Sequence, residues 1–153
     1  MPFFSYDSRI SILYSLLSIL YSPVSMKKFF ISRIHSFGHA FRGWWYVIRT
    51  QRNAWIHALI TSAVIVLSAW LGLPAWDWAV LFIAIALVWS AEFVNTALEA
   101  VVDLASPRHH PLAKVGKDVG AAAVLIAALT SILVGLLILG PPLLERLKTL
   151  LSG

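Results

Sequence analysis

The chain has 153 residues, of which 59% are hydrophobic and only 12% are charged, and this balance excludes an ordinary soluble globular domain and predicts an integral membrane protein. The absence of cysteine excludes both a disulfide framework and a thiolate metal site. The net charge of +5 does not indicate a nucleic-acid partner, because the basic residues lie beside apolar runs, where they report membrane orientation.

The N-terminal segment, residues 1–28, is predicted to be an extension, and we assign it no function. Its semi-apolar run, residues 10–21, is too short to span a bilayer and lacks the basic start of a signal peptide. Met26 is followed by two lysines and looks like a natural start. The residues before it are therefore either an upstream extension or an interfacial anchor.

Residues 29–52 are predicted to form an amphipathic surface helix. Arginines are interleaved there with aromatic and aliphatic residues, as in the run Arg42-Gly43-Trp44-Trp45. A helix of this kind lies in the headgroup layer, where arginines meet lipid phosphates and aromatic rings sit at the interface. The pattern fits a plain membrane anchor and a catalytic role equally well.

Three membrane spans are predicted to follow, and with the surface helix they make an all-α membrane domain, residues 29–142, before a C-terminal tail, residues 143–153. The turn Gly72-Leu73-Pro74 ends the first span, and Gly140-Pro141-Pro142 ends the third. The predicted spans are residues 54–73, 78–103 and 117–139.

Basic residues are concentrated on one side of these spans. The surface helix and the loop between residues 103 and 117 are rich in lysine and arginine, whereas the turn near Pro74 holds only Asp77. The positive-inside rule therefore places the surface helix and the loop in the cytoplasm. The sequence predicts a multi-pass protein of the cytoplasmic membrane, and an active site built from these basic segments would lie on the cytoplasmic side.

The second span carries an acidic face near its end. At about 100° per residue, the polar side chains of this helix fall within roughly 60° of one line. They are Glu92, Asn95, Thr96, Glu99 and Asp103. A surface helix often has such a wet face, but the preceding residues, 78–91, are apolar all round. Because ionisable groups in or beside a membrane span usually face a bundle interior or a water-filled site, we predict a functional face.

Depth in the bilayer separates the acidic residues. With Trp78 at the far interface, Glu92 lies roughly 21 Å along the helix, Glu99 roughly 31 Å and Asp103 roughly 37 Å, against a hydrocarbon core of about 30 Å. Glu92 is thus below the cytoplasmic surface, where a drier setting makes a carboxylate a competent proton acceptor for a lipid hydroxyl. Glu99 and Asp103 lie in water, where oxygen ligands hold magnesium together with nucleotide phosphates.

Cationic residues gather at the start of the third span. Facing carboxylates on the neighbouring helix, they form a site that could bind polyphosphate bridged by magnesium, whereas without those carboxylates a solvated loop is the simpler interpretation. No Walker-type or protein-kinase glycine loop is present, which excludes a soluble kinase fold. Lys117 and Asp118 begin the span, and Arg108, His109, His110 and Lys114 lie in the loop before it.

These residues resemble the motifs of a known family. The run from Glu92 to Asp103, with Asn95-Thr96-Ala97 and Glu99 inside it, is followed at fixed spacing by His110-Pro111-Leu112-Ala113-Lys114 and by Lys117-Asp118. Together they resemble the small prokaryotic integral-membrane diacylglycerol kinases over about residues 36–141. The variant H-H-P-L-A-K is similar to the branch that phosphorylates undecaprenol.

The resemblance implies an ATP- and magnesium-dependent lipid kinase that works as a homotrimer with sites shared between subunits. It places the general base on Glu92 and a magnesium ligand on Glu99. Its nucleotide contacts fall on Asn95, Asp103, Arg108, His109, His110, Lys117 and Asp118, and also on His39 of the surface helix.

One position departs from the family pattern. The family has a second metal-binding glutamate after the surface helix, in a pattern like T-E-x-N-x-x-I-H, whereas this chain has Thr50-Gln51-Arg52-Asn53-Ala54-Trp55-Ile56-His57. Gln51 keeps an oxygen ligand for the metal but loses a charge, so magnesium affinity should fall.

Several alternatives stay open at this point. Diacylglycerol could replace undecaprenol as the acceptor. A small transporter subunit would also place one glutamate inside a bundle, but it would not need Asp103, Lys117 and Asp118 gathered on the cytoplasmic side. A catalytically silent membrane scaffold would be consistent with Gln51.

Overall fold

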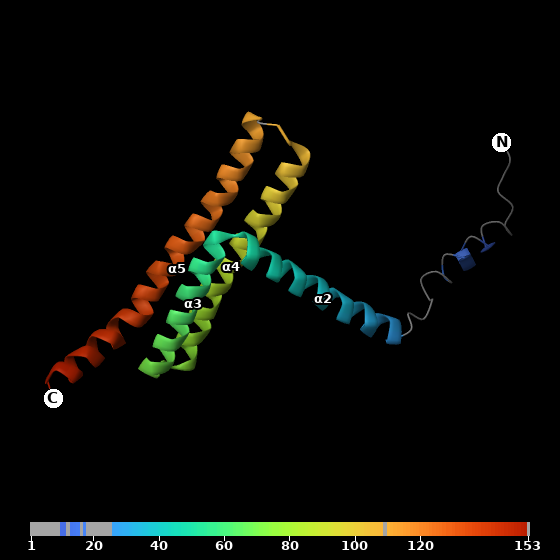
Figure 1. The fold of residues 1–153 in the computed structure, drawn as a ribbon. Coiled ribbons are helices and arrows are strands. Elements are labelled where there is room, and N and C mark those ends of the chain that lie inside the picture. The colour runs from blue at the N-terminus through green and yellow to red at the C-terminus, as the bar shows by residue number, and fades with distance from the viewer. Residues whose placement is uncertain (1–9, 12, 16, 18–25, 109, 153) are drawn as a thin grey trace. The chain divides into compact units, whose positions relative to one another are not determined.

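The computed structural model describes residues 10–11, 13–15, 17, 26–108 and 110–152 (Figure 1). Its long helices are α2 (Met26–Thr50), α3 (Arg52–Leu71), α4 (Ala75–Ala105) and α5 (Pro111–Ser152). Helices α3, α4 and α5 are each long and apolar enough to cross a membrane. The predicted all-α membrane protein with three spans is therefore confirmed, whereas most of the predicted N-terminal extension lies outside the described residues.

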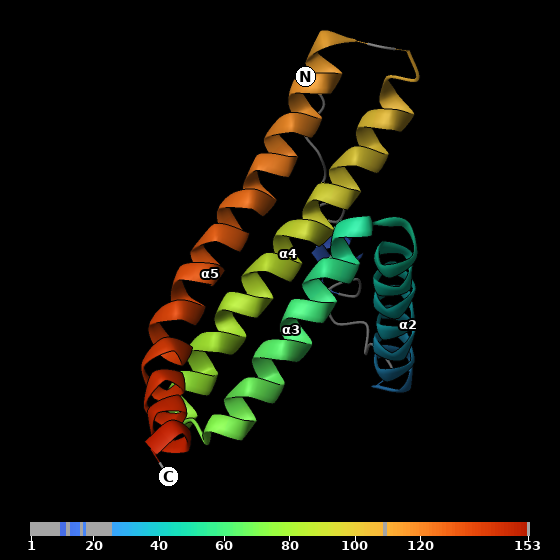
Figure 2. The same cartoon turned by 60° about the vertical axis from the view of Figure 1, so that its left-hand side comes forward.

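The chain divides into two compact units, residues 1–42 and 43–153. The second unit holds the last residues of α2 and the whole of α3, α4 and α5. Within this unit α4 runs beside α5 for much of its length, and α3 packs against both of them (Figures 1 and 2). The second unit thus forms a three-helix bundle.

A tight turn joins α3 to α4. Gly72 has a φ of 67°, in the left-handed region that glycine adopts without strain, and its N–H donates to the Ala69 carbonyl over 3.2 Å. Leu73 N–H donates to the Ser68 carbonyl over 3.3 Å, and Pro74 then precedes α4. This hydrogen-bonded stop reverses the chain, as the run Gly72-Leu73-Pro74 predicts.

The connection from α4 to α5 is shorter than the sequence suggests. Helix α4 continues to Ala105, and α5 begins at Pro111. Proline is well suited to the first position of a helix, where its fixed φ is helical and its missing N–H is not needed. Lys114 is therefore helical, and its predicted place in the loop was wrong.

Helix α5 also runs further than the predicted third span. Pro141 and Pro142 lie inside the helix, which continues to Ser152. Proline removes helical hydrogen bonds, but membrane helices tolerate it because neighbouring groups satisfy the freed carbonyls. Residues 143–152 are thus the end of α5 and not a separate tail.

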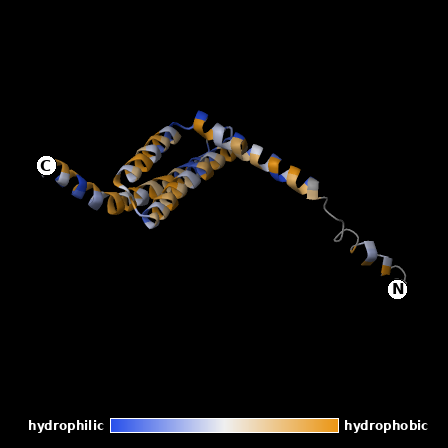
Figure 3. Cartoon of the chain, turned by 90° about the horizontal axis from the view of Figure 1, so that it is seen from below, coloured by the Kyte–Doolittle hydropathy of each residue, from blue (hydrophilic) through white to orange (hydrophobic). Residues whose placement is uncertain are grey.

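The packed core of the bundle is narrow. Leu81, Ala84 and Val88 of α4 are buried, as are Val124 and Ala127 of α5. Most other large apolar side chains of α3, α4 and α5 are exposed on the bundle, and Figure 3 shows hydrophobic residues along the length of all three helices. Such outer faces are expected of helices that contact lipid.

Candidate functional site

The polar face of α4 passes from a buried to an exposed position along the helix. Glu92 is only 1% exposed, and Asn95 and Thr96 are also buried. Glu99 is half-buried, and Asp103 near the end of the helix is exposed. The structure thus brings the first part of this face into the bundle and leaves the last part open to water.

Glu92 faces His57 of α3. The Glu92 Oε2 and His57 Nε2 atoms are 3.8 Å apart, which is an ion-pair contact but too long for a hydrogen bond. Thr96 donates its hydroxyl to the Glu92 main-chain carbonyl and leaves the carboxylate alone. Among the described residues, neither Glu92 carboxylate oxygen nor His57 Nε2 has a hydrogen-bond partner. Such buried, unpaired atoms are costly and point to a ligand that completes them.

Glu99 lies between two side-chain amides. Gln51 donates from Nε2 to Glu99 Oε2 over 3.3 Å, and Asn95 donates from Nδ2 to Glu99 Oε1, also over 3.3 Å. Gln51 is the single residue between α2 and α3, and its extended backbone brings it to α4. The Glu99 carboxylate is a hard oxygen ligand of the kind that can bind magnesium together with nucleotide phosphates, and the two amides present their N–H groups to it.

A resident metal ion has less support. In the part of the chain that the structure describes, no three histidine, cysteine, aspartate or glutamate side chains come together as a metal cluster. Magnesium, however, commonly uses only one or two carboxylates and takes its remaining ligands from phosphates and water. Glu99, with Gln51 next to it, could therefore hold an ion that takes its other ligands from phosphates and water.

Asn95 packs against a gap in α5. Its Oδ1 atom is buried and has no hydrogen-bond partner among the described residues. A Cβ added at Gly120 would collide with that oxygen and come within 3.1 Å of Leu98 Cδ2. Because Gly120 has no side chain, the Asn95 amide fits against α5 at this position and keeps its hydrogen bond to Glu99.

The exposed end of the face carries a positive partner. Lys117 of α5 forms an ion pair with Asp103 of α4 over 2.5 Å. The two side chains are 38% and 65% exposed, so a phosphate in water could reach Lys117. Asp118, the next residue, is exposed as well. Asp103 of α4 and Lys117 of α5, both predicted to contact the nucleotide, are therefore in contact at this end of the bundle.

The connection between α4 and α5 supplies further polar groups. Arg108 and His110 are exposed there. The Arg108 carbonyl accepts a hydrogen bond from the Ser106 hydroxyl over 3.0 Å, and His110 Nδ1 accepts one from Leu112 N–H over 3.2 Å. His109 lies outside the described residues, and its predicted contact with the nucleotide stays a prediction.

His39 belongs to the first unit of the chain. Within that unit, its Nδ1 atom lies 2.9 Å from Nη2 of Arg42, one helical turn further along α2. This contact is local to the helix. The predicted role of His39 at the nucleotide stays a prediction.

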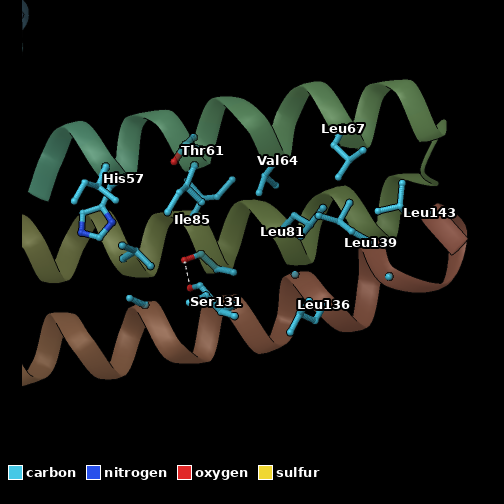
Figure 4. Close-up of a pocket in the computed structure, with 18 residues that line it drawn as sticks. His57, Thr61, Val64, Leu67, Leu81, Ile85, Ser131, Leu136, Leu139 and Leu143 are labelled. Atoms are coloured by element: carbon cyan, nitrogen blue, oxygen red, sulfur yellow. Dashed lines mark hydrogen bonds between the residues drawn. The ribbon is translucent and has the colours of Figure 1, made fainter. Parts of the chain in front are cut away.

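An apolar cavity of about 470 Å³ lies between α3, α4 and α5. Its lining is almost wholly hydrocarbon, with Thr61 and Ser131 among the few polar members. Figure 4 shows the labelled lining residues running from His57 at one end to Leu143 at the other. Since His57 also contacts Glu92, the cavity ends beside the buried carboxylate.

His57 and Trp89 are the two site residues that the sequence interpretation missed. His57 lies within the predicted first span and receives no role from the sequence pattern, although a histidine inside a membrane helix is itself a sign of a functional site. Trp89 lies deep in the second span, away from the interfaces where tryptophan is usual. Their ring centroids are 6.3 Å apart in an edge-to-face contact.

Comparison with known proteins gives a consistent result. The family model for prokaryotic diacylglycerol kinase matches residues 38–139. This range includes the polar site residues described above, from Gln51 to Asp118. The chain is 44% identical over 108 residues to the undecaprenol kinase of Bacillus subtilis (strain 168), a match that covers 71% of this chain and 88% of that protein.

Diacylglycerol kinases also match. The one from Synechocystis sp. is 46% identical over 111 residues, covering 72% of this chain and 63% of that protein. The one from Escherichia coli (strain K12) is 34% identical over 89 residues, covering 54% of this chain and 73% of that protein.

Proposed function

The chain belongs to the prokaryotic diacylglycerol kinase family and is a membrane lipid kinase, and we propose that its acceptor is undecaprenol. The reaction transfers the γ-phosphoryl group of ATP to the hydroxyl of the lipid. The likeness to an undecaprenol kinase and the motif H-H-P-L-A-K support this acceptor.

The observation that carries the proposal is the separation of two sites on one helix. Glu92 is buried in the bundle, whereas Glu99 lies two turns further along α4, roughly 10 Å away by the helical rise, next to two amides. A lipid hydroxyl needs a base below the membrane surface, and ATP needs phosphate ligands in water. The two ends of this polar face meet those two needs.

The cavity supports a long apolar acceptor. Its lining is hydrocarbon and lies within the membrane-spanning part of the bundle, ending at His57 beside Glu92. A benzene-sized ligand fills a cavity of roughly 150 Å³, so about 470 Å³ could hold on the order of three such groups, or the first few isoprene units of a polyprenol. The elongated shape of this cavity suits a single-chain alcohol better than a two-chain diacylglycerol (Figure 4).

We assign the chemical step to residues of this chain. Glu92 accepts the proton of the lipid hydroxyl while that oxygen forms its bond to the γ-phosphorus. The bond from the γ-phosphorus to the bridging oxygen breaks, and its electron pair leaves with ADP. Lys117 would neutralise charge on the phosphates through its own ammonium group, which its contact with Asp103 holds at this end of the bundle.

Magnesium would be held by Glu99 and Gln51, and Asn95 would contact the nucleotide. When bound, it would neutralise the phosphate oxygens and orient the polyphosphate. The Glu99 carboxylate, with the side-chain amide of Gln51 next to it, supports this assignment.

We further propose that the protein lies in the cytoplasmic membrane with its nucleotide site facing the cytoplasm. The basic residues of the surface helix and of the segment between residues 103 and 117 support this orientation. We also propose a homotrimer with shared sites, with α2 lying on the membrane surface. The small exposed residues Ala121, Ala122 and Ala123 of α5 would allow a neighbouring helix to approach closely. The mass of the purified protein in detergent tests the assembly, and a fully active monomer would contradict it.

The acceptor is tested by offering undecaprenol and diacylglycerol side by side to the purified protein with γ-labelled ATP. We expect label in undecaprenyl phosphate at a higher kcat/KM than in phosphatidic acid. A preference for diacylglycerol would overturn the acceptor and leave the lipid kinase in place. ATP use without label in any lipid would favour a transporter subunit, and no ATP use would favour a scaffold.

A further inference from the structure

We propose that His57 is a positioning residue that holds the Glu92 carboxylate in place for proton transfer, an inference that rests on the proposed role of Glu92 as the base. His57 and Glu92 come from different helices, and their Nε2 and Oε2 atoms are 3.8 Å apart. In the described part of the chain, no side chain hydrogen-bonds to the Glu92 carboxylate, and His57 is the residue in ion-pair contact with it. The imidazole is thus the group available to fix its orientation.

The burial of both groups makes this contact important. The Glu92 side chain is 1% exposed and that of His57 is 13% exposed, so water offers each little compensation for a missing hydrogen bond. A hydrogen bond from Nε2–H to Oε2 would require the two atoms to move closer than the 3.8 Å that separates them here. The other carboxylate oxygen, Oε1, is then left free to take the proton from the lipid hydroxyl.

His57 is itself held in place by Trp89. The two rings meet edge to face at an interplanar angle of 66°. The Trp89 indole N–H donates to the Thr61 hydroxyl over 3.2 Å, and Thr61 lies one helical turn after His57 on α3. This arrangement fixes the tryptophan ring against the same face of α3 that carries the histidine.

A second tryptophan continues the contact to the end of α2. Trp44 stacks on Trp89 with ring centroids 5.9 Å apart and an interplanar angle of 30°. Both residues belong to the second unit of the chain. The position of His57 therefore depends on a stack of rings that starts at α2 and ends at the buried carboxylate.

The place of His57 at the end of the apolar cavity defines its role further (Figure 4). A lipid whose chain fills the cavity presents its hydroxyl at the end where His57 and Glu92 meet. The proton passes from the hydroxyl to Glu92, and His57 takes no part in the transfer itself. His57 acts through the carboxylate, so its loss should lower kcat and leave the KM for ATP unchanged.

Substitutions of His57 that differ in side-chain length distinguish a positioning role from a packing role. His57→Gln keeps an amide N–H close to the place of imidazole Nε2, whereas His57→Asn carries the same amide on a shorter stem that cannot reach Glu92. His57→Leu fills space without a donor. We expect kcat to fall roughly 10- to 100-fold in His57→Leu and His57→Asn and only about threefold in His57→Gln.

Ser68→Ala is the matched control. Ser68 is a fully buried polar residue of the same helix, and its hydroxyl donates only to the Val64 carbonyl over 2.7 Å, away from the cavity and the site. We expect its kcat to match that of the native protein. Thermal midpoints and ATP affinity are measured for all four variants, and each kcat is taken from folded protein in the same lipid nanodiscs.

The outcomes are distinct. Equal kcat values in His57→Gln and His57→Asn, or a kcat in His57→Leu close to that of the native protein, would overturn the inference while Glu92→Gln, assayed in parallel, still decides the role of the base. Rescue by leucine but not by glutamine would show a packing role and also overturn it. If the native protein labels no lipid, the proposed function fails first and this inference fails with it.

Discussion

Gln51 donates a hydrogen bond from Nε2 to Glu99 Oε2 over 3.3 Å, although the two residues are 48 positions apart in the chain. Gln51 lies between α2 and α3 with φ −99° and ψ 117°, and this extended residue turns its amide toward the polar face of α4. The position at which the family pattern has a glutamate therefore faces Glu99 in this chain.

Gln51→Glu should lower the magnesium concentration needed for half-maximal activity severalfold. The substitution adds a second negative charge beside Glu99, and hard cations are held largely by charged oxygen ligands. Activity is measured against magnesium at saturating ATP and lipid. Asn53→Asp, which adds the same charge two residues later at an exposed position, is the control and should leave the midpoint unchanged. An unchanged midpoint in Gln51→Glu would mean that Gln51 is not at the metal.

Gly120→Ala should impair the site more than the fold. The new Cβ would collide with Asn95 Oδ1, and the amide would turn away and lose its hydrogen bond to Glu99 Oε1. Helix propensity favours alanine by about 1 kcal/mol, which offsets part of an overpacking cost of about 1–3 kcal/mol. We expect a raised KM for ATP with a modest change in thermal midpoint.

Gly116→Ala provides the comparison for this substitution. Its Cβ would meet only Val102 Cγ2 at 3.7 Å, an ordinary contact, one turn earlier on the same helix. Native kinetics are expected here. Equal KM values for ATP in the two alanine variants would show that the gap at Gly120 does not matter to the nucleotide.

Lys117→Met should raise the KM for ATP roughly 10- to 100-fold, the range expected when a hydrogen bond to a charged group is lost. The pair with Asp103 is well exposed, and exposed pairs add little to stability, so the thermal midpoint should hardly change. Steady-state kinetics with varied ATP, together with thermal unfolding, test both statements. An unaltered KM would remove Lys117 from the nucleotide site.

Gly135→Leu should weaken lipid binding by filling the cavity. Gly135 lines the cavity, and a Cβ there meets no atom within 4 Å, so the larger side chain can extend into open space. We expect a higher KM for undecaprenol and an unchanged KM for ATP. Ala63→Leu adds the same side chain to an exposed position of α3 outside the cavity lining and serves as the control. If both variants had the native KM for lipid, the hydrocarbon chain of the lipid would not bind in this cavity.

Helical periodicity and membrane depth were sufficient to predict much of this arrangement. They separated Glu92 inside the bundle from Asp103 in water, and the structure has these two residues buried and exposed respectively. They also predicted three spans and the turn at Gly72. Each of these features depends on the sequence of one helix or one turn, so it can be predicted from a short segment of the chain.

Features that depend on contacts between helices were not predictable in the same way. The pairing of His57 with Glu92 requires the register of α3 against α4, which no local pattern gives. The continuation of α5 through Pro141 and Pro142 was missed because proline normally ends a helix in water. Lys114 was placed in a loop because charged residues that precede an apolar span are usually part of a loop. Here the helix begins earlier, at Pro111.

The transfer of label from γ-labelled ATP to undecaprenol by the native protein and by Glu92→Gln tests the central claim most directly. Glu92 is buried without a hydrogen-bond donor to its carboxylate among the described residues, and glutamine keeps its shape but cannot accept the proton. We predict a kcat lowered by about 10²- to 10⁴-fold with nearly native ATP affinity, whereas Glu99→Gln loses ATP affinity. A Glu92→Gln enzyme with native turnover, or equal losses of ATP affinity in both variants, would contradict the account.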